Sequence, residues 1–331
     1  MASYTVFKFK NLTPLHIGTG KENYDFSSSV LQSDTLSAAL ASMRAMGGHT
    51  DDIKEFMDSF VISSAFPFAG SQFFLPKPQG RIAVKVAGKE EHQYRKKLKA
   101  VKFIESSIWN KLTNGCSVDV DESQLQKDFL VDTGKESFDK PSLTQVTQRV
   151  FVPREEGKDT EPFFFSWTYF NSNAGLYCIV DAEKSVVDEV EQLFVMLGES
   201  GLGTDKNVGG GKFELERVEM DVVSNSVQPD SSMLLSTYIP TEEEVALLNM
   251  SESKYELIQR SGFMAGSEID DFRHLRKKSI YMFNVGSLFK TIDKLSGKIV
   301  DIKPDWNDER MHPVYRSGKP FVVPVKLLND E

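Results

Sequence analysis

The sequence predicts an α+β fold in two parts, of which the second is a shorter version of the first. Three observations support this prediction. Segments with strand-like alternation and segments with helical spacing of apolar residues succeed each other up to residue 218. A polar stretch over residues 224–232 follows them, and weaker strand patterns fill the rest of the chain. With 331 residues, the chain is long enough for two hydrophobic cores.

The first predicted elements are a strand and a helix. Phenylalanines alternate with lysines in residues 4–12, which indicates a strand that ends before Pro14. A helix is expected to begin at Ser33 or Asp34, because either side chain can cap a helix N-terminus. Its apolar residues recur at helical spacing, and the two glycines at 47–48 stop it.

Two short strands and a long insertion are predicted next. The aromatic-rich segment 63–78 reads as two short strands with a turn at residues 69–71. The insertion covers about residues 79–161. Within it, residues 94–108 show helical spacing and carry one arginine and several lysines. A solvated helix face explains these cations at least as well as an RNA contact does.

The first part closes with two strands, a helix, a loop and a strand. Residues 162–171 and 176–181 are expected to form two strands around a hairpin turn at 171–175. Apolar residues at helical spacing over 186–197 then predict an amphipathic helix. A glycine-rich loop at 201–211 connects this helix to a strand that starts near residue 213.

The resulting order β-α-β-β-α-β is that of a ferredoxin-like, or RRM-like, sheet. We therefore predict an N-terminal ferredoxin-like domain over residues 1–223 and a degenerate one over residues 232–331. Strand patterns in the second domain start at about residue 233 and recur at 254–259, 279–285, 299–302 and 321–326. A helix that begins with three glutamates after Thr241 interrupts them.

Composition excludes several classes of protein. No run approaches the roughly 18 apolar residues that span a membrane, and the start of the chain does not resemble a signal peptide, so we expect a cytoplasmic protein. The two cysteines supply neither a zinc quartet nor a disulfide framework, so we expect no metal and no cofactor. The net charge of −9 argues against an indiscriminate nucleic-acid binder. Residues 1–110 nevertheless carry +4, which suits a defined RNA site together with protein partners.

Five glycines in eleven residues make the 201–211 loop the strongest functional signal. Glycine allows positive φ and close approach of the backbone, so main-chain N–H groups of this loop could meet phosphates directly. A mobile surface connector is the alternative. The loop follows a helix and precedes a strand, the reverse of a P-loop or a dinucleotide fingerprint. Phe213 also stands where a Walker motif needs Ser or Thr, which excludes an NTPase or dehydrogenase site.

Several segments together resemble the RAMP superfamily of CRISPR proteins and, within it, the fourth Csm subunit of type III-A effector complexes. The segments that carry the resemblance span residues 4–326 and include Leu15–Gly18, Ser33–Leu36, Ile62–Phe68, Phe74–Pro78, the glycine-rich loop and His312–Phe321. The resemblance implies two packed ferredoxin-like domains that hold the repeat-derived 5′ handle of a crRNA. It also implies two neighbours, the large subunit with a polymerase-like palm and the adjacent RAMP backbone subunit.

The resemblance also suggests where the handle binds. We expect it to lie between segment 15–20 and the glycine-rich loop. The RNA-binding candidates there are His16, Gly18, Gly20, Lys21, Gly201, Gly203, Lys206, Gly209, Gly210, Gly211 and Lys212. The glycines would donate main-chain N–H groups and the lysines would add charge. His16 would stack on a base or bind a phosphate, although a histidine at a strand end is more often structural. Asp205 opposes the lysines locally.

Three arginines complete the set of candidates. Segment 144–155 resembles the thumb hairpin with which RAMP subunits interrupt bases, and Arg149 and Arg154 are its candidates. Arg44, on the predicted first helix, either anchors RNA or extends along the helix surface.

Two other functions stay open. Related RAMP endoribonucleases process or cut RNA, and His16 with Lys21 or Tyr24, or Asp25 in its loop, would be the catalytic groups here. A second convincing acid–base partner is missing, so we expect a protein that is not an enzyme. The acidic second half also fits a scaffold that binds only protein.

Overall fold

The computed structural model describes residues 4–18, 24–28, 30–132, 138, 140–153, 159–226, 228–264, 267, 269–290 and 294–328. Within these ranges, helices and strands mix along the whole chain, as the predicted α+β class requires. None of the helices in the described part of the chain is long and apolar enough to cross a membrane.

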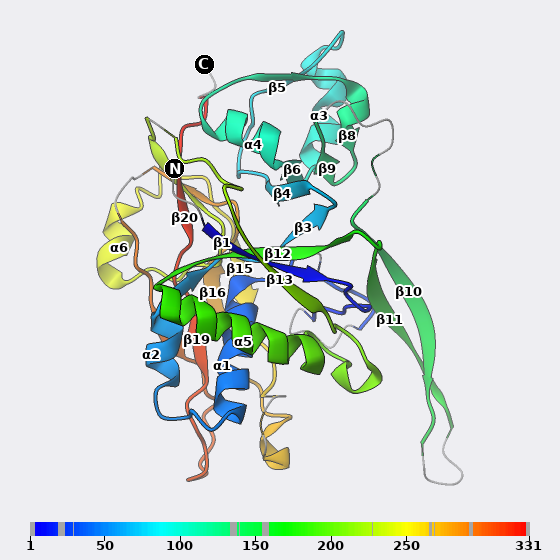
Figure 1. Ribbon diagram of the computed structural model, residues 1–331, viewed down its shortest axis with the longest axis vertical. Helices are drawn as coiled ribbons and strands as arrows, with labels where there is room; N and C mark the ends of the chain where they lie inside the picture. Colours follow the sequence, from blue (N-terminus) through cyan, green and yellow to red (C-terminus); the bar gives the residue numbers. More distant parts are fainter. Residues whose placement is uncertain are drawn as a thin grey trace.

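A mainly antiparallel sheet organises the first half (Figure 1). Strand β1 (Tyr4–Lys10) lies between β12 (Ala174–Ala182) and β13 (Glu214–Met220). The sheet continues from β12 through β3 (Phe66–Ala69) and β4 (Gln72–Pro76), while β2 (Phe60–Ile62) pairs with another part of β12. The predicted strand at residues 4–12 and the turn at 69–71 are confirmed.

Two helices cover one face of this sheet, α1 (Ser33–Met46) and α5 (Lys184–Ser200), with α2 (Ile53–Asp58) beside α1 (Figure 1). The side chains of Phe7 and Phe9 in β1 point toward Phe194 of α5, with ring centroids 5.4 and 5.1 Å apart. The apolar stripe that predicted α5 is therefore its core face. Both helices and the strand after the glycine-rich loop are confirmed.

The insertion extends the sheet and adds a small layer of its own. Strands β6 (Phe103–Glu105), β8 (Leu125–Gln126) and β9 (Phe129–Leu130) continue the sheet beyond β4. The other elements are β5 (Val84–Val86), parallel to β7 (Val118–Val120), the helices α3 (Glu91–Ala100) and α4 (Ser106–Thr113), and a 3₁₀ turn at Glu122–Gln124. The helical spacing at 94–108 thus covers two helices with a strand between them. Phe103 and Ile104 leave the helical course because they pair with β4 and β9 and are buried there.

A long hairpin projects from the body (Figure 1). It consists of β10 (Ser142–Phe151) and β11 (Glu161–Phe170), antiparallel over their full length. The hairpin expected from segment 144–155 is confirmed. The strands expected at 162–171 and 176–181 and the turn between them are present. Their predicted pairing is wrong, because β11 pairs with β10 whereas β12 pairs with β1, β2 and β3.

The second half consists of small sheets. Its elements are β14 (Ser231–Leu234), α6 (Glu242–Leu247), β15 (Leu257–Arg260), a 3₁₀ turn (Asp270–Phe272), β16 (Ile280–Phe283), β17 (Leu288–Phe289), β18 (Ile299–Asp301), β19 (Tyr315–Ser317) and β20 (Val322–Val325). Strand β14 lies between β17 and β20, β15 pairs with β16, and β18 pairs with β19. Strands β14, β15, β16, β18 and β20 overlap the predicted segments, whereas the sequence patterns do not predict β17 and β19. The described strands form separate sheets instead of one.

The two halves share a hydrophobic core. Met233, Leu235 and Val323 belong to the cluster that contains Phe66 and Tyr177 of the first half. Thr241 caps α6 as predicted, since its side chain accepts a hydrogen bond from the Glu244 N–H. Burial of the interface means that the second half completes the core on the face of the sheet opposite α1 and α5.

Candidate functional site

The glycine-rich loop folds tightly between α5 and β13, with a 3₁₀ turn at Lys206–Val208. Gly201, Gly203, Gly209 and Gly211 have positive φ angles between 69° and 89°. A Cβ atom at Gly211 would lie 1.9 Å from the Leu202 carbonyl oxygen, and one at Gly201 would lie 2.5 Å from the Gly210 oxygen. Glycine is needed at these positions because the two arms of the loop touch through their backbones.

Most of the amides in this loop already have partners. Gly201 N–H donates to Leu197, Gly209 N–H to Lys206, Gly210 N–H to Asp205 and Gly211 N–H to Pro14, all to carbonyl oxygens at 2.7–3.2 Å. Gly203 N–H is the exception, because no described residue accepts from it. Four of the five glycine amides that were expected to meet phosphates are therefore already paired within the protein. These donors close the loop instead.

The lysines of the loop have free charges. The side chains of Lys206 and Lys212 are exposed and form no ion pair with any residue that the structure describes. Desolvation lowers the pKa of Lys206. An approaching anion would oppose this shift, because an opposite charge favours the protonated ammonium. Their arrangement agrees with the expectation that these lysines add positive charge to the loop.

Arg149 joins the hairpin to the loop. Its Nη1 lies 2.9 Å from Oδ2 of Asp205, and its guanidinium stacks 4.4 Å from the ring centre of Phe165 and 5.2 Å from that of Trp167. About a third of the Arg149 side chain stays exposed (34%). Asp205, which lies beside the lysines in sequence, thus has its own cation, which leaves the charge of Lys206 and Lys212 less compensated.

His16 is buried beneath this cluster. Its ring packs 4.6 Å from Phe165, its Nδ1 lies 2.8 Å from the carbonyl oxygen of Ser166, and the residue is only 1% exposed. Tyr24 stacks on the outer side of Phe165 and is 53% exposed. The placement favours a packing role for His16, whereas Tyr24 presents an aromatic face that can reach a base.

The other candidate residues lie in different places. Gly18 is exposed, near Thr204 of the glycine-rich loop. Arg44 lies on the helical face, where it pairs with Asp52 and Glu189 and stacks 4.8 Å from Phe56. This placement favours its role as a structural side chain that joins α1, α2 and α5. Gly20, Lys21 and Arg154 lie outside the described residues.

We call the exposed surface formed by Tyr24, Arg149, Lys206 and Lys212 the loop–hairpin face. The bridge between Leu15 and Thr168 connects the segment after β1 to the hairpin. Thr13 connects it to the glycine-rich loop, because its side chain donates to the Gly209 oxygen at 2.9 Å and accepts from the Lys212 N–H at 2.8 Å. Three segments that are distant in sequence therefore meet at one surface.

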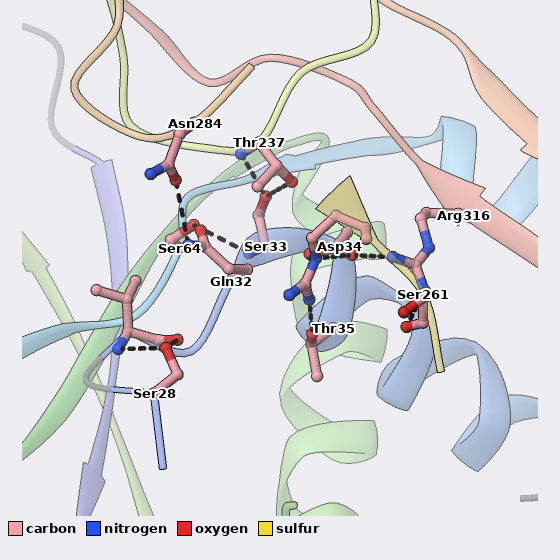
Figure 2. Close-up of polar contacts among 12 residues, drawn as sticks. Ser28, Gln32, Ser33, Asp34, Thr35, Ser64, Thr237, Ser261, Asn284 and Arg316 are labelled. Carbon is pink, nitrogen blue, oxygen red and sulfur yellow. Dashed lines mark hydrogen bonds and ion pairs between the residues drawn. The ribbon is translucent and has the colours of Figure 1, made fainter. Parts of the chain in front are cut away.

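A second polar cluster, which the sequence did not predict, joins the two halves (Figure 2). Asp34 does not cap α1, because Gln32 occupies the N-cap position of this helix. Instead its carboxylate accepts two hydrogen bonds from Arg260, both at 3.0 Å, and one from Arg316 at 2.9 Å. Ser33 bonds Thr237 in the same seam, and this contact also crosses between the halves.

The electrostatics of this cluster are set by one anion among several cations. Desolvation raises the pKa of Asp34, but Arg260 and Arg316 outweigh it and hold the pKa below its ordinary value. Desolvation and the charge of Arg316 lower the pKa of the neighbouring Lys277 to about 8. No local sequence signal identifies these partners, because they lie more than 220 residues from Asp34.

The described residues contain no group of three or more His, Cys, Asp or Glu side chains that could hold a metal ion. Of the groups considered for RNA cleavage, Asp25 is exposed and His16 is buried. The rings of His16 and Tyr24 are 6.5 Å apart between centroids, and Phe165 packs against both.

Comparison with known proteins identifies the family. Residues 8–214, more than half of the chain, match the family model of the RAMP superfamily. The chain belongs to the RAMP superfamily. Residues 228–325 of this RAMP protein match a second model, the CRISPR Csm4 C-terminal domain. The resemblance found in the sequence is thereby confirmed.

Relatives match this RAMP protein along nearly all of its length. A protein of Mycobacterium tuberculosis named CRISPR system Cms protein Csm4 is 25% identical over 308 residues, which cover 92% of this chain and 93% of the relative. A protein of the same name from Streptococcus thermophilus is 27% identical over 326 residues, 94% of this chain and 96% of the relative.

Solved structures show the same fold. The RAMP protein superposes on a chain from the crystal structure of a Csm1-Csm4 cassette in complex with cA4 with a TM-score of 0.64 and 18% identity, over 99% of this chain and 100% of the other. A chain from the Csm3-Csm4 subcomplex of the type III-A CRISPR-Cas interference complex gives a TM-score of 0.60 at 17% identity, over 98% and 100%.

Proposed function

We propose that this RAMP protein is a Csm4-type subunit of a type III-A CRISPR interference complex, where it holds the 5′ handle of the crRNA. In this role it joins the large palm-containing subunit to the adjacent RAMP backbone subunit in antiviral defence. The observation that carries the proposal is the match to proteins named Csm4 over more than nine-tenths of both chains. The match to the Csm4 C-terminal model supports it independently.

The strand order supports a ferredoxin-like fold for the first half. The strands follow the order β13-β1-β12-β3, and α1 and α5 pack on one face. This is the strand order of a β-α-β-β-α-β chain when β2–β3 counts as its second strand along the sequence and β12 as its third. Because α1 and α5 cover one face of this sheet and the second half packs on the other, the ends of the strands and the loop after α5 remain as the surface for a ligand.

The loop–hairpin face is the proposed handle-binding surface. Lys206 and Lys212 would contact phosphates, and Tyr24 would stack on an unpaired base, which is how single-stranded RNA is commonly recognised. Arg149 would add a guanidinium from the hairpin. Closing of the loop by its own hydrogen bonds means that side chains at its rim, rather than the glycine amides, supply the contacts.

We also propose that the subunit is not catalytic. Support comes from His16, whose ring is covered by Phe165 and whose Nδ1 is held by a backbone carbonyl. The test is incubation of the purified chain with repeat RNA or with complementary target RNA. Cleavage that is abolished by His16→Ala or by Asp25→Ala would overturn this part of the proposal.

The function is tested by recovering the chain, tagged, from the organism that encodes it and sequencing the RNA that co-purifies. Short guides that share one 5′ repeat sequence are expected. The variant Lys206→Glu with Lys212→Glu should recover fewer guides, while Lys54→Glu with Lys184→Glu, the same charge change at exposed lysines elsewhere, should not. A chain that carries its protein partners but no RNA would instead indicate a protein-binding scaffold.

A further inference from the structure

The insertion carries a concentration of positive charge that the proposed function does not use. Residues 77–102 contain nine Lys or Arg and two Asp or Glu, a net charge of +7. The whole chain has a net charge of −9, so the remainder carries −16. A segment of this sign within an acidic protein is the electrostatic footprint expected of a polyanion site.

The structure arranges these cations around a cleft of about 1230 Å³. One wall is β5, which contributes Lys85, and the other is α3, which contributes Arg95 and Lys99. Apolar side chains, among them Ile82 and Leu98, line the space between the walls. Two carboxylates, Glu91 and Asp119, also line the cleft, against six Lys or Arg, so the lining keeps a net positive charge. Cations on both walls can therefore hold an anionic chain from two sides.

The three cations have no carboxylate partner among the described residues. Several neighbouring basic residues do have partners: Arg81 pairs with Glu91, Lys89 and Lys97 share Glu122, and Lys102 pairs with Asp128. The ion pairs thus occupy some cations of the segment, whereas those of Lys85, Arg95 and Lys99 remain available to a ligand.

The side chain of Lys77 caps the C-terminal end of α3. Lys77 donates to the carbonyl oxygens of Leu98 and Lys99, both at 3.2 Å, which satisfies the C-terminus of the helix and anchors it beside β5. Desolvation lowers the pKa of Lys77. The position of the wall that carries Arg95 and Lys99 is thus set by contacts inside the protein.

We propose that this cleft binds the backbone of single-stranded RNA, at a site separate from the loop–hairpin face. Arg95 and Lys99 lie one helical turn apart, about 6 Å along the axis, so they can follow successive charges of a strand. Among the described residues that line the cleft, Tyr94 is the single aromatic one, and it is buried. Contact is therefore with phosphates, independent of base sequence and strongly dependent on salt.

The backbone of β5 disfavours an acidic peptide as the occupant. A peptide would commonly add as a strand to the free edge of β5. The N–H and carbonyl groups of Val84 on that edge are already used, by the Ile82 oxygen at 2.9 Å and the Tyr94 hydroxyl at 3.3 Å. With only side-chain cations left to hold it, the occupant is better matched by a nucleic-acid strand, which carries a fixed negative charge at every nucleotide.

The proposal does not rest on the function proposed above. The glycine-rich loop follows α5 and lies beside the hairpin, whereas β5 and α3 lie at the other end of the molecule (Figure 1). A failure of handle recovery and a failure of cleft binding can therefore be told apart by which variants produce them.

The experiment measures binding of the full chain to a labelled oligouridylate of about 16 nucleotides over a range of salt concentrations. Lys85→Glu, Arg95→Glu and Lys99→Glu are combined in one variant. The control combines Lys54→Glu, Lys184→Glu and Lys298→Glu, three exposed lysines outside the cleft. Circular dichroism checks that both variants fold as the parent does.

The cleft variant should lose about 2 from the slope of log affinity against log salt, about 0.7 for each lost contact. Between about 50 and 200 mM salt, its affinity should therefore fall about 20-fold less than that of the parent. The control should keep the parental slope. Equal slopes for cleft variant and parent would overturn the proposal, and so would cleft-dependent binding of polyglutamate with no binding of the oligouridylate.

Discussion

Replacement of Asp34 by Asn tests whether the buried polar seam holds the two halves of the chain together. The Asp34 side chain is 1% exposed and accepts three charge-assisted hydrogen bonds from Arg260 and Arg316. At about 1.5–3 kcal/mol each, these bonds set a ceiling of about 5–9 kcal/mol. Asn retains one acceptor oxygen but leaves the guanidiniums without a counter-charge, so we expect a loss of about 3–5 kcal/mol.

Urea unfolding of the full chain, followed by far-UV circular dichroism, measures this loss. Asp181→Asn, at an exposed carboxylate without an ion pair to any described residue, is the matched control and should change stability by less than about 0.5 kcal/mol. Combining Asp34→Asn with Arg316→Met should cost less than the sum of the two, because both remove the same contact. A loss below about 1 kcal/mol for Asp34→Asn, or strict additivity, would refute the reasoning.

The pH dependence has a defined sign. The folded pKa of Asp34 lies below its unfolded value, so its contribution to stability is present above the unfolded pKa and is lost as the pH falls through the folded pKa. Asp34→Asn should therefore flatten the acid side of the stability curve. An unchanged acid limb in the variant would contradict this assignment.

The remaining predictions concern the loop, a helix cap and the cysteines. Gly209→Ala should lower the free energy of unfolding by about 1–2 kcal/mol, because its φ is positive but a Cβ there meets no neighbour. Gly211→Ala should lower it by about 1–3 kcal/mol more, because its Cβ would also clash with the Leu202 backbone. Equal losses of stability in thermal melts of the two variants would contradict this geometry. Desolvation raises the pKa of Glu244, but three backbone N–H donors outweigh it and hold the pKa at about 2. The stabilisation by this carboxylate is therefore full above about pH 4.5 and is lost as the pH falls toward about 2, and Glu244→Gln should remove it. Parallel curves of stability against pH for parent and variant would contradict this prediction. Iodoacetamide should modify exposed Cys116 and spare Cys178, whose thiol pKa is raised by burial, until the chain is unfolded; native labelling of both, seen by mass spectrometry, would show that the core opens.

Elements that rest on local hydrophobic spacing could be predicted from the sequence. Helix α5 and strand β1 were predictable because their apolar side chains meet in one core, so the period of the pattern is the period of the contact face. The break between α3 and α4 was not predictable, because Ile104 fits the helical spacing as well as the strand. Its pairing with Leu75 and Leu130 decides between the two, and these partners are distant in sequence.

The candidate site shows the same division. The glycine-rich loop was found because five glycines in a short segment are rare without a backbone reason, and the structure supplies that reason. The partners of its amides could not be read from the sequence, nor could the burial of His16, because both depend on how β11 folds over the segment after β1. The sequence alone does not identify the seam around Asp34, because a single aspartate near a helix start is equally typical of a cap.

The backbone hydrogen bonds of the glycine-rich loop hold its two arms and the segment at Pro14 in one arrangement. Little conformational entropy is left for it to lose when a partner orders around it, so affinity at its rim depends mainly on the side chains placed there. Tolerance to substitution within the loop should follow the distance to neighbouring backbone rather than solvent exposure. In an assembly, such a loop would keep its conformation, and a flexible partner would adapt its own conformation to the loop.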